Sequence, residues 1–214
     1  FPDVYVHTHL SENKNEIAWV KELFPEQNGY LDVYHHFGLT GSKSVFAHCV
    51  HLEQHEWQCM HDTDSAIAFC PTSNLFLGSG LFPLHTAWDK QVKVGLGSDV
   101  GAGTSFNQLQ TLNEAYKVQQ LQGNKLSAFE ALYHATLGSA KALSLEDKLG
   151  NFNLGKEADF VVLDLNATAL QRLRQSRAKN IEDALFALIT MGDDRNIAAT
   201  YVFGECVYRQ SSAK

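Results

Sequence analysis

The sequence predicts an α/β fold in which a parallel sheet is covered by helices and forms half of a TIM-like (β/α)8 barrel. Strand-like and helix-like segments alternate through the first hundred residues, in units of roughly 20–40 residues. The strand segments are almost continuously apolar, which is typical of parallel strands buried on both faces. After about residue 150 this alternation stops and short β-rich segments follow, which indicates a second kind of structure.

Four segments are candidate strands because each is a short run of apolar, β-branched or aromatic residues. They are residues 4–9, 44–50, 66–70 and 92–97. Helical periodicity and end signals predict helices between and after them, at 12–23, 30–37, 52–60 and about 84–89. Gly38 is expected to close the second of these helices, and Pro71 to stop the third strand before a loop over 72–80.

Two further helices are predicted beyond the fourth strand, over 105–121 and from the capping box Ser127–Glu130 to Ala135. The C-terminal part is expected to hold a loop, a strand, an amphipathic helix and a hairpin, at 150–159, 160–164, 181–191 and 200–208. In the hairpin, Gly204–Glu205 is predicted to be a two-residue type II′ turn. Residues 1–149 are therefore assigned to the half-barrel and residues 150–214 to a region associated with a small β-sandwich.

Composition narrows the classes of partner. Among 214 residues, 17 Lys and Arg face 24 Asp and Glu, which gives a formal net charge of −7 without any basic block. A nucleic-acid partner and an anionic membrane surface are both disfavoured. No stretch is apolar enough to cross a membrane. The four cysteines form no C-x-x-C pair, so we expect reduced thiols in a cytoplasmic protein. The opening at Phe1, without an initiator Met, is expected to be a cut through a longer protein.

Metal-capable side chains fall at the carboxyl ends of the predicted strands. His7 and His9 end the first, His48 ends the second, and Asp99 follows the fourth. Those ends meet on one face of a parallel barrel, where imidazole and carboxylate suit a catalytic zinc. Glu12 lies three residues beyond His9. We expect His9 and Asp99 to bind the metal, Glu12 to shuttle a proton, Asp99 to accept one from water, and His48 to polarise the substrate or hold the attacking hydroxide.

Other patterns were weighed against this site. The remaining histidines are expected on helices or loops as non-ligands: His35, His36, His51, His55, His61, His85 and His134. The glycines between 95 and 101 do not form G-x-G-x-x-G, so a dinucleotide site is disfavoured. The H-x-E and P-C-x-x-C signature of cytidine-deaminase zinc folds is absent from the sequence.

Five segments resemble the amidohydrolase superfamily: residues 7–12, 45–49, 69–75, 95–100 and 149–162. The loop from Ser73 to Phe82 is similar, more narrowly, to that of guanine deaminases. In the superfamily an H-x-H pair ends barrel strand one. Only 90 residues separate His9 from Asp99 (99 − 9), too few for seven more βα units. We therefore expect these strands to be five to eight, and the chain to be the C-terminal half of the barrel.

The resemblance implies hydrolysis of guanine to xanthine and ammonia, with zinc as cofactor, iron as the alternative, and a homodimeric enzyme. It implies that His9 and Asp99 are ligands and that Glu12 touches the purine. Asn74 and Phe76 would line the base pocket. The strand-one His pair and an upstream Arg of the family lie outside the chain, and Ser98 stands where Thr is commoner.

Two alternatives stay open. The substrate of the same fold could be another ring amine or a cyclic amide. The 214 residues alone could also be a non-catalytic half-barrel with exposed sheet edges and weak zinc binding.

Overall fold

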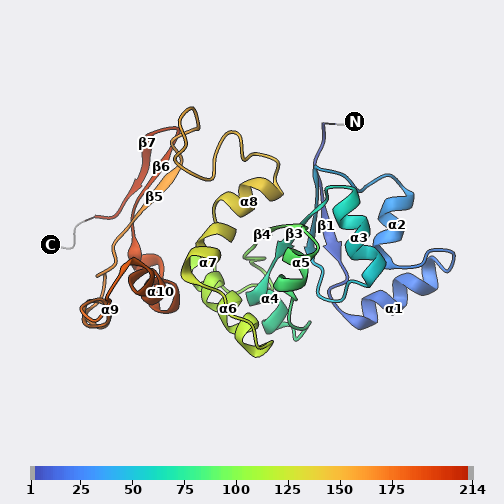
Figure 1. The fold of residues 1–214 in the computed structure, drawn as a ribbon, viewed down its shortest axis with the longest axis horizontal. Helices are drawn as coiled ribbons and strands as arrows, with labels where there is room; N and C mark the ends of the chain where they lie inside the picture. The colour runs from blue at the N-terminus through green and yellow to red at the C-terminus, as the bar shows by residue number, and fades with distance from the viewer. Residues whose placement is uncertain (1–2, 212–214) are drawn as a thin grey trace.

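The computed structural model describes residues 3–211 and contains two separate sheets (Figure 1). The first consists of β1 (Val6–Leu10), β2 (Ser44–His48), β3 (Ala66–Phe69) and β4 (Lys93–Leu96), in that order, with every neighbouring pair parallel. The predicted parallel sheet and its four strands are confirmed. In the β1–β2 register Leu10 lies opposite His48, so the last residues of the two strands reach the same edge of the sheet.

Helices connect and cover the strands in the predicted order. They are α1 (Lys14–Leu23), α2 (Tyr30–His36), α3 (Gln54–Asp62), α4 (Pro71–Phe76), α5 (Leu84–Asp89), α6 (Gln108–Leu121), α7 (Ala128–His134) and α8 (Leu137–Ala142). Local signals explain several starts. The Asn13 side chain caps α1 by accepting from the backbone N–H of Glu16. The predicted capping box of Ser127 and Glu130 opens α7.

The two faces of the parallel sheet pack differently because successive side chains on a strand point to opposite sides. Phe46 and Ile67 enter the main hydrophobic core beneath the helices, and both are fully buried. On the other face Ala66 packs with Ala142 of α8. A Cβ at Gly95 would lie 3.0 Å from the Cα of Ser139, so α8 and β4 approach more closely than a larger residue at 95 allows.

Three local predictions were wrong or incomplete. Residues 72–80 were expected to be a loop, but they begin inside α4, because proline at the first helical position needs no hydrogen-bonded N–H. Helix α6 starts at Gln108 and not at Ser105, since Asn107 is its cap. The six-residue helix α8 was not predicted, being too short to show a periodic pattern.

The C-terminal part forms an antiparallel sheet and two helices. Strands β5 (Phe160–Leu163), β6 (Ile197–Val202) and β7 (Glu205–Arg209) pair in that order. Helix α10 (Ile181–Met191) matches its prediction, whereas α9 (Ala169–Gln175) and the 3₁₀ turn Asp194–Asn196 were not predicted. The hairpin is confirmed but its turn is shifted by one residue. Phe203 and Gly204 have φ of 52° and 77°, the signs of a type I′ turn, so the predicted type II′ turn is wrong.

Helix α10 ties the C-terminal part to the first sheet. It packs on α6 and α7, and its Leu188 and Ile189 belong to the main core. The sheet β5–β7 itself lies on the far side of α6–α8 from β1 (Figure 1). The domain boundary at residue 150 stays a prediction. Within residues 3–211, no helix combines the length and apolarity that a membrane crossing requires.

We expect the free energy of unfolding to fall as the pH drops below about 6.5, because of His134. Its Nδ1–H donates to the carbonyl of Val94 at 3.0 Å, and its Nε2 accepts from the indole N–H of Trp88 at 3.1 Å. Both nitrogens of the neutral ring therefore have a hydrogen-bond partner. Burial lowers the pKa of His134, so the unfolded chain binds a proton that the folded chain resists. Urea unfolding between pH 5 and 8 tests this. The fall of the unfolding free energy with decreasing pH should be smaller in His134→Gln and unchanged in His61→Gln, an exposed control.

Candidate active site

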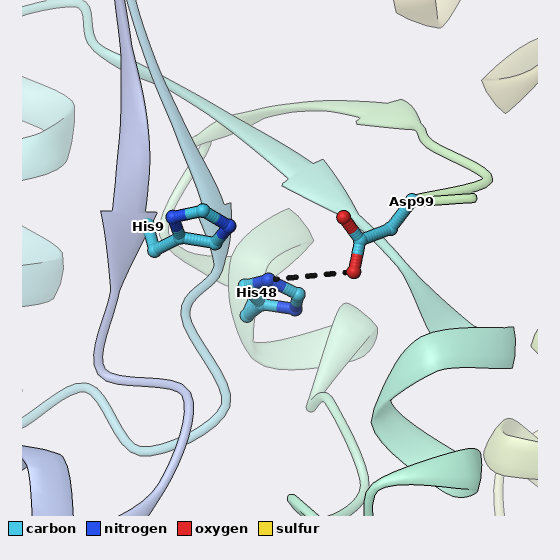
Figure 2. Close-up of side chains that lie close together, drawn as sticks. All are labelled: His9, His48 and Asp99. Atoms are coloured by element: carbon cyan, nitrogen blue, oxygen red, sulfur yellow. Dashed lines mark ion pairs between the residues drawn. The ribbon is translucent and has the colours of Figure 1, made fainter. Parts of the chain in front are cut away.

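Three side chains meet at the carboxyl edge of the parallel sheet, and Figure 2 shows them together. His9 comes from β1, His48 is the last residue of β2, and Asp99 follows β4. One donor atom from each lies within 4.8 Å of the other two. The Nε2 atom of His48 is 3.9 Å from Oδ2 of Asp99. The structure thus brings together three of the residues that the sequence selected, although 90 positions separate the first from the last (99 − 9).

His48 is held in one orientation and one tautomer. Its ring is buried, stacks on His9 with a centroid distance of 5.3 Å, and lies 2.8 Å from the Asn74 Oδ1 through Nδ1. An amide oxygen only accepts, so Nδ1 carries the hydrogen, and in the neutral ring Nε2 then keeps a lone pair. That Nε2 is buried and has no hydrogen-bond partner among the described residues. A buried unpaired nitrogen is costly, and a cation or a ligand hydrogen would satisfy it.

Glu12 borders the three-residue cluster on one side. Its Oε2 lies 3.7 Å from Nε2 of His48, and its side chain is only 14% exposed. The other oxygen, Oε1, accepts a hydrogen bond of 2.8 Å from the Ser79 hydroxyl. One oxygen of Glu12 is therefore committed to the protein and the other faces the cluster, a suitable place for a proton carrier.

The backbone around the cluster is unusual. Ser11, His48, Cys49 and Asp99 have φ of 48°, 73°, 50° and 49°, a region that non-glycine residues rarely adopt. Each follows or ends a strand of the parallel sheet, so the chain bends sharply where the functional side chains leave it. Such strain persists where surrounding structure over-determines it, and it is common at functional sites.

The loop after β4 needs glycine to hold Asp99. The backbone N–H of Gly103 donates to the Asp99 carbonyl at 2.5 Å. A Cβ built on Gly103 would lie 1.7 Å from the carbonyl oxygen of Ser98, which no side chain tolerates. The loop therefore folds back over Asp99 only because residue 103 has no side chain.

Cys70 also belongs to this edge, although from the sequence it was expected only to be one of four reduced thiols. It follows β3 and is the N-cap residue of α4. Burial, and then the charges of Asp99 and Glu12, raise the pKa of its thiol to about 12, so it stays neutral. Its position at a strand end was the signal that would have selected it. No local signal marked Asn74 as a partner of His48 or Ser79 as a partner of Glu12.

The remaining predicted residues lie apart from the cluster or behind it. Asn74 lies on α4, is 1% exposed, and contacts Nδ1 of His48, the nitrogen that does not face Asp99. Phe76 ends α4 and is 66% exposed. His7 is exposed on β1, and the only possible metal-binding group found among residues 3–211 does not include it. That group also excludes the seven histidines expected to be non-ligands. The roles of Asn74 and Phe76 in substrate binding stay predictions.

Known proteins resemble the chain over nearly its whole length. The amidohydrolase family model matches residues 1–207. Guanine deaminase of Escherichia coli (strain K12) is 64% identical over 211 residues, which are 99% of this chain and 48% of the relative. A solved structure of E. coli guanine deaminase superposes with a TM-score of 0.97 at 64% identity, covering 99% of this chain and 49% of that one. The chain thus spans about half the length of the curated relatives it matches.

Two more distant solved structures hold a bound ligand. Guanine deaminase from C. acetobutylicum, with guanine bound in its active site, has a TM-score of 0.85 and 34% identity, covering 96% of this chain and 49% of that one. An adenosine deaminase from Xanthomonas campestris, with bound zinc, has a TM-score of 0.84 and 25% identity, covering 95% and 45%.

Proposed function

Because this chain belongs to the amidohydrolase family, we propose that the protein containing it hydrolyses guanine to xanthine and ammonia at the cluster of His9, His48 and Asp99. The observation that carries the proposal is this convergence, with Glu12 beside it at 3.7 Å from His48. The 64% identity to a guanine deaminase supports guanine as the substrate. A purine base and water would be the small-molecule partners, and a homodimeric state and a cytoplasmic location remain predictions.

We propose that β1 to β4 are strands five to eight of a TIM-like (β/α)8 barrel, and that residues 150–214 accompany a small β-sandwich. The parallel order of the sheet and the half-length coverage of the relatives support half of such a barrel, and the assignment to strands five to eight rests on the short interval between His9 and Asp99. Among the described residues β1 and β4 each pair on one side only, so the rest of a barrel would close both edges. We therefore expect little catalysis from the 214 residues alone.

The donor set fits a divalent metal. Two imidazoles and a carboxylate supply borderline nitrogen and hard oxygen, the combination typical of catalytic zinc, and ferrous iron accepts the same donors. His9 and Asp99 would hold the ion. The unpaired Nε2 of His48 would be a third ligand or would contact the attacking water. A bound cation of this kind acidifies water and makes hydroxide available near neutral pH.

The side chains would then carry out the proton transfers of the reaction. Asp99 would take the proton that water loses when its oxygen attacks the ring carbon bearing the amine. Glu12, protonated at the start, would give its proton to the adjacent ring nitrogen. Asp99 would pass the proton of the water to the amine, and the hydroxyl left on the ring carbon would return a proton to Glu12 as it becomes the carbonyl. The C–N bond breaks, ammonia leaves, and the carbonyl of xanthine remains. His48, fixed by Asn74, would orient the attacking oxygen through Nε2.

Incubation of the full-length, metal-loaded protein with guanine tests the proposal. We expect xanthine and ammonia in equal amounts, and loss of turnover after chelation that zinc restores. Ammonia from another ring amine, or opening of a cyclic amide, with guanine left untouched would instead support one of the alternative substrates. A full-length protein that is active on guanine without any metal would contradict the proposed chemistry.

A further inference from the structure

We propose that Ser79 is a positioning residue for Glu12, and that its hydroxyl determines which carboxylate oxygen faces the reacting centre. The inference rests on the role proposed above for Glu12. The Ser79 Oγ donates to Oε1 of Glu12 at 2.8 Å, across 67 positions of sequence. The free Oε2 is the atom that lies 3.7 Å from His48.

This hydrogen bond removes a freedom that would impair proton transfer. A carboxylate has two equivalent oxygens, and rotation about its last bond exchanges them at little cost. The serine hydroxyl donates and Oε1 accepts, whether or not the other oxygen carries a proton, and the bond is charge-assisted when the carboxylate is ionised. Pinning Oε1 leaves Oε2 as the oxygen that exchanges a proton with the substrate. Misplacement of a reacting group by about 1 Å can cost about a hundredfold in rate.

Ser79 is itself held by the connection between β2 and α3. Its carbonyl oxygen lies 2.8 Å from Nε2 of His51, and the backbone N–H of His51 donates to the carbonyl of Ser11 at 3.1 Å. Gly80 has φ of +136°, and a Cβ there would lie 2.9 Å from Cγ1 of Val50. Segments that follow β1, β2 and β3 are thus linked into one support behind Glu12. Such a chain of contacts would hold the Ser79 hydroxyl, and with it the Glu12 carboxylate, in one position.

A double-mutant cycle in the full-length protein tests the inference. We expect Ser79→Ala to lower kcat by about ten- to a hundredfold while KM changes by less than about twofold. In a Glu12→Gln background the same substitution should change kcat by less than about twofold, because the side chain that Ser79 positions can no longer exchange a proton. The matched control is Ser44→Ala, since Ser44 is a buried serine at the first residue of β2, away from the carboxyl edge, whose hydroxyl donates to the carbonyl of Leu39 at 2.8 Å. It should keep wild-type kcat.

Zinc content and the melting temperature should match the wild type in Ser79→Ala, which separates positioning from loss of metal or fold. If Ser79→Ala does not fold, His51→Ala provides the second arm, because it releases the Ser79 carbonyl and should show the same dependence on Glu12. Equal losses of kcat in both backgrounds, or no loss in either, would overturn the inference. Wild-type activity in Glu12→Gln alone would instead remove the role proposed for Glu12.

Discussion

Replacing Asp99 by Asn should lower kcat for guanine by at least about a thousandfold in the full-length protein. The substitution removes the charge that would hold the cation and the group that would accept the proton of the attacking water. Asn keeps the size of the side chain, and the loop hydrogen bond from Gly103 uses the backbone carbonyl, so the fold should survive. Steady-state kinetics and metal analysis check this together, and zinc content should fall with activity.

The control for Asp99→Asn is Asp89→Asn, an exposed carboxylate at the end of α5 that contacts no residue of the cluster. Both its activity and its metal content should match the wild type. If Asp99→Asn retained wild-type turnover, Asp99 could be neither an essential ligand nor the base.

Glu12→Gln is expected to reduce kcat by about a hundred- to ten-thousandfold, the usual range for a lost acid–base group. In contrast to Asp99→Asn, it should leave zinc bound, because Glu12 lies outside the three-residue metal group. Gln also preserves an oxygen that can accept from Ser79. A loss of turnover with full zinc occupancy, compared with the exposed Glu22→Gln on α1, would separate the proton carrier from the metal ligands. Full turnover in Glu12→Gln would remove Glu12 from the mechanism.

Much of the site followed from one positional argument. In a parallel sheet the carboxyl ends of the strands share an edge, so His9, His48 and Asp99 could be brought together from sequence once the strands were recognised. Glu12 came with them because it closely follows the first strand. Apolar continuity of the strands was sufficient because buried parallel strands admit few other patterns.

The residues that hold the site residues in place could not be predicted in this way. The Asn74–His48 and Ser79–Glu12 contacts join residues 26 and 67 positions apart, and no local pattern signals such a pair. Cys70 differs because its place at a strand end is visible in the sequence, but its high thiol pKa reflects burial and two charges brought close only by folding.

The missed elements share a physical cause. Helices α4 and α8 are six residues long, which is too short for periodicity to separate them from a turn. Their stability comes from tertiary packing, since α4 buries Asn74 against His48 and α8 packs on the close approach at Gly95. The hairpin turn lies one residue from its predicted position because Phe203 adopts a positive φ, which sequence rules expect of glycine or asparagine.

The proposed chemistry requires that His9, His48 and Asp99, carried on separate strands, form one metal site beside Glu12. Anomalous diffraction at the zinc edge, from crystals of the full-length, zinc-loaded protein, tests it most directly. We predict a single strong peak at the carboxyl edge of the parallel sheet, within coordinating reach of His9 and Asp99 and next to Nε2 of His48. An active protein whose only metal peak lies away from these side chains would contradict the account.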